Sequence, residues 1–148
     1  MLFNDGGKWF VYEAIQPVSK TPFEEWITHG DHNYYVVKRL KNADSVLSKP
    51  ALNKMHAYVT KNLGKNYDIA FNWSDENFYC SELVWKAYHE ATGLEVGQTK
   101  PLGEYDLSNP VVKEQLARRY GKNIPLKEPM ISPGSIFESE LLVTVKEH

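Results

Sequence analysis

The sequence predicts a single α+β domain with a small, largely antiparallel sheet. The chain has 148 residues, which is a typical length for one domain with its own core. Charged residues make up 24% and hydrophobic residues 42% of it, close to the averages for folded globular proteins. Strand-like and helix-like segments are mixed without regular βαβ alternation, and this mixture favours the α+β class.

Local patterns predict the elements in order. The turn-forming run Asn-Asp-Gly-Gly at 4–7 precedes an alternating strand at 9–13, so the hairpin has an almost absent first strand. The Thr-Pro-Phe-Glu run at 21–24 is typical of a helix start, with Thr21 as the N-cap. The other predicted elements are a strand at 34–40, helices at 44–63 (broken or kinked near Pro50), 80–91 and 110–120, a helical turn at 132–133 and a strand at 141–145.

Charge and hydropathy exclude several classes of partner. The formal net charge is −2, so the chain lacks the basic field that nucleic-acid binding uses. No apolar run approaches the roughly 18 residues of a membrane span, and no signal peptide is visible. We therefore expect no nucleic-acid partner. We expect no cofactor either, and the cellular location stays undetermined.

The single cysteine, Cys80, begins the predicted helix at 80–91. Counting 3.6 residues per turn places Leu83, Val84 and Ala87 on its face, so we expect Cys80 to point inward. The opposite face, with Glu82, Lys86, His89 and Glu90, should be solvated. A buried cysteine is often only a small core residue. However, a first helical turn offers unpaired N–H groups that favour a thiolate and can bind an oxyanion, so a nucleophile is the alternative.

None of the five histidines is a convincing base for Cys80. His89 lies half a turn away on the helix, and His56 borders an apolar stripe. His29 and His32 flank a turn, and His148 is terminal. The histidine and cysteine spacings of zinc sites are also absent, so we expect no metal.

Several stretches resemble the YiiX/YaeF family, which are permuted relatives of NlpC-type papain-like cysteine amidases. They are "FYCSELVWKAY", "YVVKRL", "TPFEEWI", "GKNYDIAFNWSDE" and "YDLSNPVVKEQLARRYGKNIPL", and the resemblance runs from residue 1 to about 146. It implies a papain-like fold in which a small antiparallel sheet packs on a helix bearing the nucleophile, Cys80, at its N-terminus. The orienting carboxylate of the family matches Glu13.

The family's catalytic histidine matches no residue of this chain. Met1 and Leu2 match the residues that follow that histidine, so we expect residues 1–148 to form one domain that is incomplete at its N-terminus. A sheet missing a strand has an exposed edge, through which we expect a homodimer to be able to form.

The resemblance implies a thiol hydrolase that acts on a small peptide, amino-acyl or acyl-lipid substrate. Trp73, Tyr79 and Tyr105 are the candidate walls of its substrate groove, although each could equally be a core residue. Two alternatives stay open: an inactive module of the same fold that binds a peptide or acyl chain, and a structural domain in which Cys80 only packs.

Overall fold

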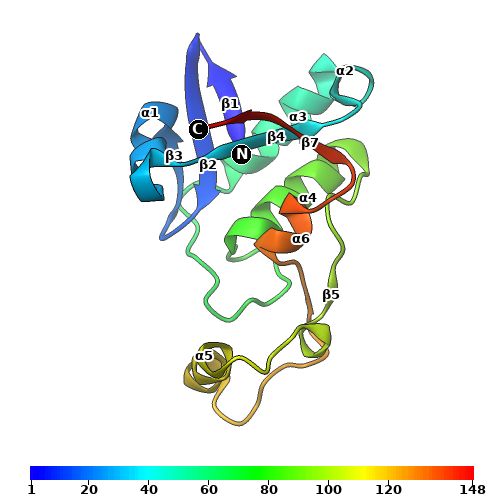
Figure 1. The fold of residues 1–148 in the computed structure, drawn as a ribbon. Coiled ribbons are helices and arrows are strands. Elements are labelled where there is room, and N and C mark those ends of the chain that lie inside the picture. Colours follow the sequence, from blue (N-terminus) through cyan, green and yellow to red (C-terminus); the bar gives the residue numbers. More distant parts are fainter.

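The computed structural model describes all of residues 1–148 and places three small antiparallel sheets beside a pair of packed helices (Figure 1). The largest sheet has the order β1-β2-β3, formed by β1 (Leu2–Asp5), β2 (Lys8–Ala14) and β3 (Val18–Pro22). The second pairs β4 (Val36–Leu40) with β7 (Leu142–Glu147), and the third pairs β5 (Lys100–Pro101) with β6 (Pro129–Met130). The α+β class is therefore confirmed.

Six helices accompany the sheets: α1 (Phe23–Trp26), α2 (Ala43–Val46), α3 (Lys49–Lys61), α4 (Cys80–Thr92), α5 (Pro110–Tyr120) and α6 (Pro133–Phe137). Short 3₁₀ turns cover Ile27–His29, Asp31–Asn33 and Leu102–Glu104. Helices α3 and α4 lie beside the sheets, whereas α5 lies at the far end of the molecule and is reached by extended connections (Figure 1). No helix is long and apolar enough to cross a membrane.

The main core lies between the three-stranded sheet and helices α3 and α4. Tyr12 and Val18 of the sheet, Val59 of α3, and Leu83 and Ala87 of α4 are at most 2% exposed and pack in one cluster. Burial of such apolar surface is the main favourable contribution to folding. The same packing fixes α4, and with it the position of Cys80, against the sheet.

The first hairpin is more complete than expected. Strand β1 has four residues and pairs with β2 in the register Leu2 to Val11 through Asp5 to Lys8. Gly6 and Gly7 form the turn with φ values of +60° and +87°, a conformation that glycine adopts without steric cost. The prediction of an almost absent first strand was wrong, because four residues are enough to pair along a strand already ordered by the core.

The break expected near Pro50 in the helix at 44–63 is present, because α2 ends at Val46 and α3 begins at Lys49, where the Ser48 side chain accepts the Ala51 N–H. One predicted helix start differs from expectation. Thr21 is not an N-cap, because it belongs to β3 and its hydroxyl donates to a side chain of β2. Strand β3 was missed because the cap-like Thr-Pro pattern concealed a strand that is stabilised by pairing with β2.

Candidate active site

Cys80 is the first residue of α4, and its side chain is exposed. It lines a hollow of about 1220 Å³, together with Val84 and Tyr88, which follow it at intervals of four residues on the same helix. The prediction that Cys80 points into the core is therefore wrong. The apolar residues of this helix face two different environments. Leu83 and Ala87 are fully buried in the main core, whereas Cys80, Val84 and Tyr88 face the hollow.

The third side of α4 faces the segment around β6. The Ser81 hydroxyl donates to the Ile131 carbonyl at 2.7 Å, and the Trp85 ring packs with Tyr79 and Ile131. Cys80 is thus held between two residues, Tyr79 and Ser81, that are each at most 3% exposed. This packing presents an exposed thiol on a rigid backbone.

Glu82 is fully buried, although the sequence pattern predicted a solvated carboxylate. Its Oε2 atom accepts the Tyr79 N–H at 3.4 Å, and its Oε1 atom lies 2.9 Å from Lys86 Nζ. Burial raises the pKa of Glu82 to about 7, against the opposing effect of the Lys86 ammonium. The overlooked signal was a glutamate at the third helical position, the capping-box place, where a side chain reaches back to the N-cap N–H.

Stability is expected to fall as Glu82 ionises. Because the folded-state pKa of about 7 is higher than the ordinary value of 4.5, the folded protein binds this proton more tightly, and its stability decreases as pH rises from about 4.5 through about 7. Urea unfolding of Glu82→Gln between pH 5 and 8 is expected to show a smaller decrease than the wild type. Parallel stability profiles for the two proteins would contradict this assignment.

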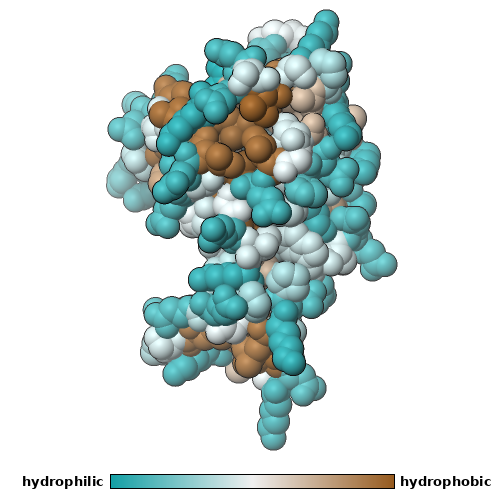
Figure 2. Space-filling model, turned by 90° about the vertical axis from the view of Figure 1, so that its right-hand side faces the viewer, coloured by the Kyte–Doolittle hydropathy of each residue, from teal (hydrophilic) through white to brown (hydrophobic).

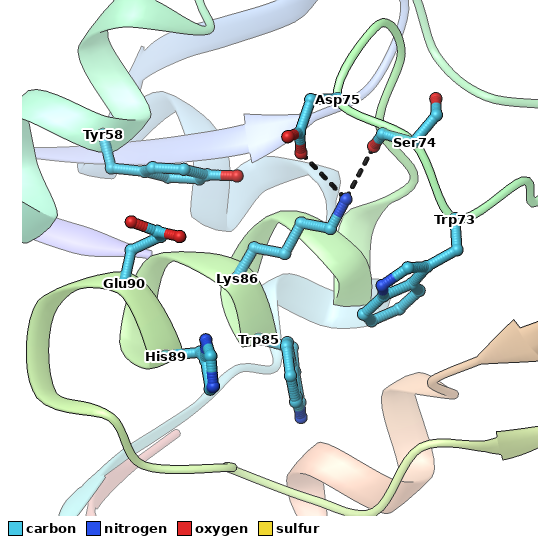
Figure 3. A pocket seen from close by; sticks show the side chains of 8 residues that line it. All are labelled: Tyr58, Trp73, Ser74, Asp75, Trp85, Lys86, His89 and Glu90. Carbon is cyan, nitrogen blue, oxygen red and sulfur yellow. Dashed lines mark hydrogen bonds and ion pairs between the residues drawn. The ribbon is translucent and has the colours of Figure 1, made fainter.

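The connection from α3 to Cys80 is ordered by its own polar contacts. The buried Asp68 carboxylate accepts the N–H groups of Ala70 at 2.8 Å and Asn72 at 2.9 Å. Lys86 of α4 donates to the Ser74 carbonyl at 2.7 Å and to Asp75 at 2.9 Å, as the dashed lines in Figure 3 show. The loop that leads to the nucleophile is therefore tied to the nucleophile's own helix.

The hollow beside Cys80 is mainly apolar, with 18 hydrophobic residues among the 27 that line it. The lining residues come from β1, β2, β4, β7 and from all α-helices except α5. Figure 2 shows hydrophobic side chains gathered on the upper part of one face and bordered by hydrophilic ones. A hollow of this size and character can hold an apolar ligand.

One polar cluster interrupts the apolar lining. His56 Nε2 lies 3.1 Å from the Asp5 carboxylate and 3.0 Å from the Tyr12 hydroxyl, which donates to Asp5 at 2.8 Å. Lys20 pairs with the same carboxylate at 2.6 Å. This histidine is thus engaged by the first hairpin, and no hydrogen bond joins it to Cys80.

Glu13 is half-buried near the end of β2, the central strand of the three-stranded sheet. Its Oε1 atom accepts the Thr21 hydroxyl at 2.7 Å, and its Oε2 atom accepts the Trp26 indole N–H at 2.9 Å. Trp26 also lines the hollow that contains Cys80. The carboxylate is therefore held in one orientation close to the border of that hollow.

The other histidines lie elsewhere. His89 stacks on Trp85, with ring centroids 4.8 Å apart, in a separate pocket of about 360 Å³ (Figure 3). His32 is 3.6 Å from the exposed Asp31 carboxylate, His29 ends a 3₁₀ turn, and the His148 ring lies 6.0 Å from that of Tyr35. None of these four lines the hollow.

The three predicted groove walls do not line this hollow. Trp73 lines the separate pocket of Figure 3. Tyr79 is 1% exposed and its hydroxyl accepts the Ile131 N–H at 3.2 Å, while the Tyr105 hydroxyl donates to the Met130 carbonyl at 3.1 Å. A substrate-binding role for these residues stays a prediction.

Comparison with known proteins defines the class to which this fold and site belong. The chain is a member of the family described as permuted papain-like amidase enzymes, YaeF/YiiX, C92, whose model matches residues 1–146. The permuted papain-like fold, with its cysteine at the start of a helix, is thereby confirmed.

Two relatives are close over the whole chain. The uncharacterized protein YiiX of Escherichia coli K12 is 45% identical over 145 residues, which cover 98% of this chain and 70% of that protein. The crystal structure of the metalloprotein yiiX from Escherichia coli O157:H7 matches with a TM-score of 0.92 and 44% identity, covering 100% of this chain and 81% of the other.

The second relative corrects one expectation. Because that protein is described as a metalloprotein, the prediction that this chain has no metal among its partners is contradicted and is withdrawn. The prediction was based on the absence of zinc-type spacings in the sequence, which says nothing about ligands brought together by the fold.

Proposed function

We propose that this chain is the nucleophile-bearing part of a thiol hydrolase that cleaves an amide or ester bond. The observation that carries the proposal is the exposed Cys80 thiol, which lies at the N-terminus of α4 and lines a hollow of about 1220 Å³. Membership of a family of papain-like amidases supports the same chemistry.

The proposed reaction has two steps. The Cys80 thiolate attacks the substrate carbonyl carbon, and the unpaired N–H groups of the first turn of α4 stabilise the resulting oxyanion. The C–N or C–O bond then breaks, and the leaving amine or alcohol takes the proton that the catalytic base accepted from the thiol. Water attacks the thioester, releases the carboxylic acid and regenerates the thiol.

We assign the base to a histidine on sequence N-terminal to Met1, with Glu13 as its orienting partner. The support is the register of the first hairpin, in which Met1 N donates to the Tyr12 carbonyl at 2.6 Å and Leu2 pairs with Val11. In this register, a residue immediately before Met1 would pair with Glu13. Paired residues of antiparallel strands have their side chains on the same face of the sheet. The fixed Glu13 carboxylate would accept the imidazole N–H.

Replacement of Glu13 by glutamine tests this assignment. In a form of the protein that hydrolyses the substrate, Glu13→Gln is expected to lower kcat by about 10-fold or more, because the imidazole loses the charge that stabilises its protonated form. The matched control is Glu24→Gln, which changes an exposed carboxylate of α1 and should leave kcat unchanged. Equal kcat values for Glu13→Gln and the wild type would remove Glu13 from the mechanism.

The apolar lining favours an acyl chain or an apolar peptide side chain over a charged substrate. A series of p-nitrophenyl esters of increasing acyl length, compared with amino-acyl p-nitroanilides, tests both the reaction and the substrate class. Each buried methylene contributes about 0.8 kcal/mol, so kcat/KM is expected to rise about fourfold per methylene until the hollow is filled. A series with no dependence on acyl length would contradict substrate binding in this hollow.

A catalytically inactive binding module is the second candidate. It is favoured by one observation, namely that each histidine between residues 1 and 148 is engaged or placed away from Cys80. Such a module would bind the acyl p-nitrophenyl esters without releasing p-nitrophenol. Turnover of the esters decides between the two functions.

The metal of the crystallised relative does not have a complete ligand set in this chain. No three histidine, cysteine, aspartate or glutamate side chains meet at one point, and the pair closest to such a site in the hollow is Asp5 with His56. A bound metal ion would need further ligands. We therefore derive no step of the reaction through a metal.

A further inference from the structure

A buried ion pair, Glu82 with Lys86, lies on the same helix as the nucleophile, two and six residues after Cys80. Glu82 is fully buried, and the Lys86 side chain is 12% exposed, with 2.9 Å between Glu82 Oε1 and Lys86 Nζ. The free energy needed to remove two charges from water offsets most of their attraction, so buried ion pairs contribute little to stability. A buried pair next to Cys80 therefore calls for an explanation other than stability.

Both members of the pair contact the segment that precedes Cys80. Glu82 Oε2 accepts the N–H of Tyr79, the residue immediately before Cys80. Lys86 Nζ donates to the Ser74 carbonyl at 2.7 Å and contacts the Asp75 carboxylate at 2.9 Å. Figure 3 shows the Lys86 side chain extending from α4 to this loop.

Two aromatic rings lie close to the Lys86 ammonium group. Lys86 Nζ lies 4.9 Å from the centre of the Trp73 ring and 5.5 Å from that of Phe78. Cation–π contacts of this kind add to the attraction of the carboxylates. Segment 73–79 is thus attached to α4 at both of its ends, by Lys86 near Ser74 and by Glu82 at Tyr79.

We propose that Glu82 and Lys86 are positioning residues for catalysis, which hold segment 73–79 on α4 so that the first turn keeps its N–H groups directed at the Cys80 thiolate and the oxyanion. The inference rests on the proposed nucleophilic role of Cys80. Neither residue touches the substrate, because neither lines the hollow.

Alkylation of Cys80 by iodoacetamide tests the proposal without any substrate. Cys80 is the only cysteine, so every adduct reports this thiol. The decisive variant is Glu82→Gln combined with Lys86→Met, which removes both ionisable groups together and leaves no buried charge unpaired. A helix N-terminus favours the thiolate, so loosening it should raise the pH midpoint of alkylation.

The expected result is a midpoint raised by about one pH unit in this double variant, which is about tenfold slower alkylation below the midpoint. Lys86→Arg, which keeps the cation, should stay close to the wild type. Glu90→Gln is the matched control, because it removes an exposed carboxylate of the same helix. Far-ultraviolet circular dichroism and urea unfolding establish that each variant is folded.

The other groups that act on the thiol are unchanged in all these proteins. The ionisable groups that share the hollow with Cys80 are the Met1 amino group and the side chains of Asp5, Lys38, Arg39, Asp44, His56 and Tyr88. Burial, and then the charge of the Cys80 thiolate, raises the pKa of Tyr67 on the preceding loop. A change in midpoint therefore reports the first turn of α4.

A folded double variant whose profile superimposes on that of the wild type would overturn the proposal. If the wild type hydrolyses no substrate but the double variant shows the expected change in the alkylation midpoint, the hydrolase function is rejected and the positioning of the thiol by Glu82 and Lys86 is retained. The experiment therefore distinguishes failure of the proposed function from failure of the positioning role.

Discussion

Replacement of Cys80 by alanine is expected to abolish hydrolysis of p-nitrophenyl esters, with a loss of about 10³-fold or more in kcat. The substitution removes the only sulfur nucleophile, and the thioester cannot form without it. Activated esters suit this test because p-nitrophenolate leaves without needing a proton. Acylation can therefore be seen even where general acid catalysis is weak.

The same substitution is expected to leave the fold unchanged. The Cys80 side chain is exposed, so its loss leaves no cavity in the core. The urea midpoint of Cys80→Ala should match that of the wild type within error. Undiminished ester hydrolysis by a folded Cys80→Ala protein would reject the proposed mechanism.

Replacement of Leu83 by alanine is expected to destabilise the protein by about 2 to 5 kcal/mol. Leu83 is fully buried in the cluster that fixes α4 to the sheet, and truncation leaves a cavity between them. The free energy of unfolding in urea measures the effect. Leu52→Ala is the matched control, because Leu52 is 40% exposed on α3 and its loss should cost much less. Equal losses for the two variants would contradict the described core.

Elements with strong local signals could be predicted from the sequence. Helix α4 ends at Gly93, whose φ of +75° is the left-handed conformation of a helix terminus. Asn109 accepts the Val111 N–H at the start of α5, and Ser132 accepts the Ser135 N–H at the start of α6. In each case the signal lies within a few residues of the boundary that it determines.

Features that depend on distant partners were less predictable. Strand β3 forms because it pairs with β2, and β4 pairs with β7 from the opposite end of the chain. The direction of Cys80 depends on which side of α4 is covered by the sheet and which is left beside the hollow. No helical count along one segment contains that information.

The residues of the candidate site also differ in how far the sequence could predict them. The resemblance of the sequence to a family led to Cys80 and Glu13, whereas the residues around them became visible only in three dimensions. Glu82 is fully buried although its position on the helix predicted exposure, and the hydrogen bond from Lys86 to the Ser74 carbonyl joins residues 12 positions apart in the sequence. The polar contacts that hold the nucleophile are therefore a property of the fold.

The most direct test of Cys80 as the nucleophile is the capture of its acyl intermediate. The protein is mixed with an acyl p-nitrophenyl ester, quenched in acid within the first turnover, digested and analysed by mass spectrometry. If Cys80 is the nucleophile, the mass of the acyl group appears on the peptide that contains Cys80 and is released by hydroxylamine. Turnover of the ester with the acyl group on another residue, or with the Cys80 peptide unmodified, would contradict this role.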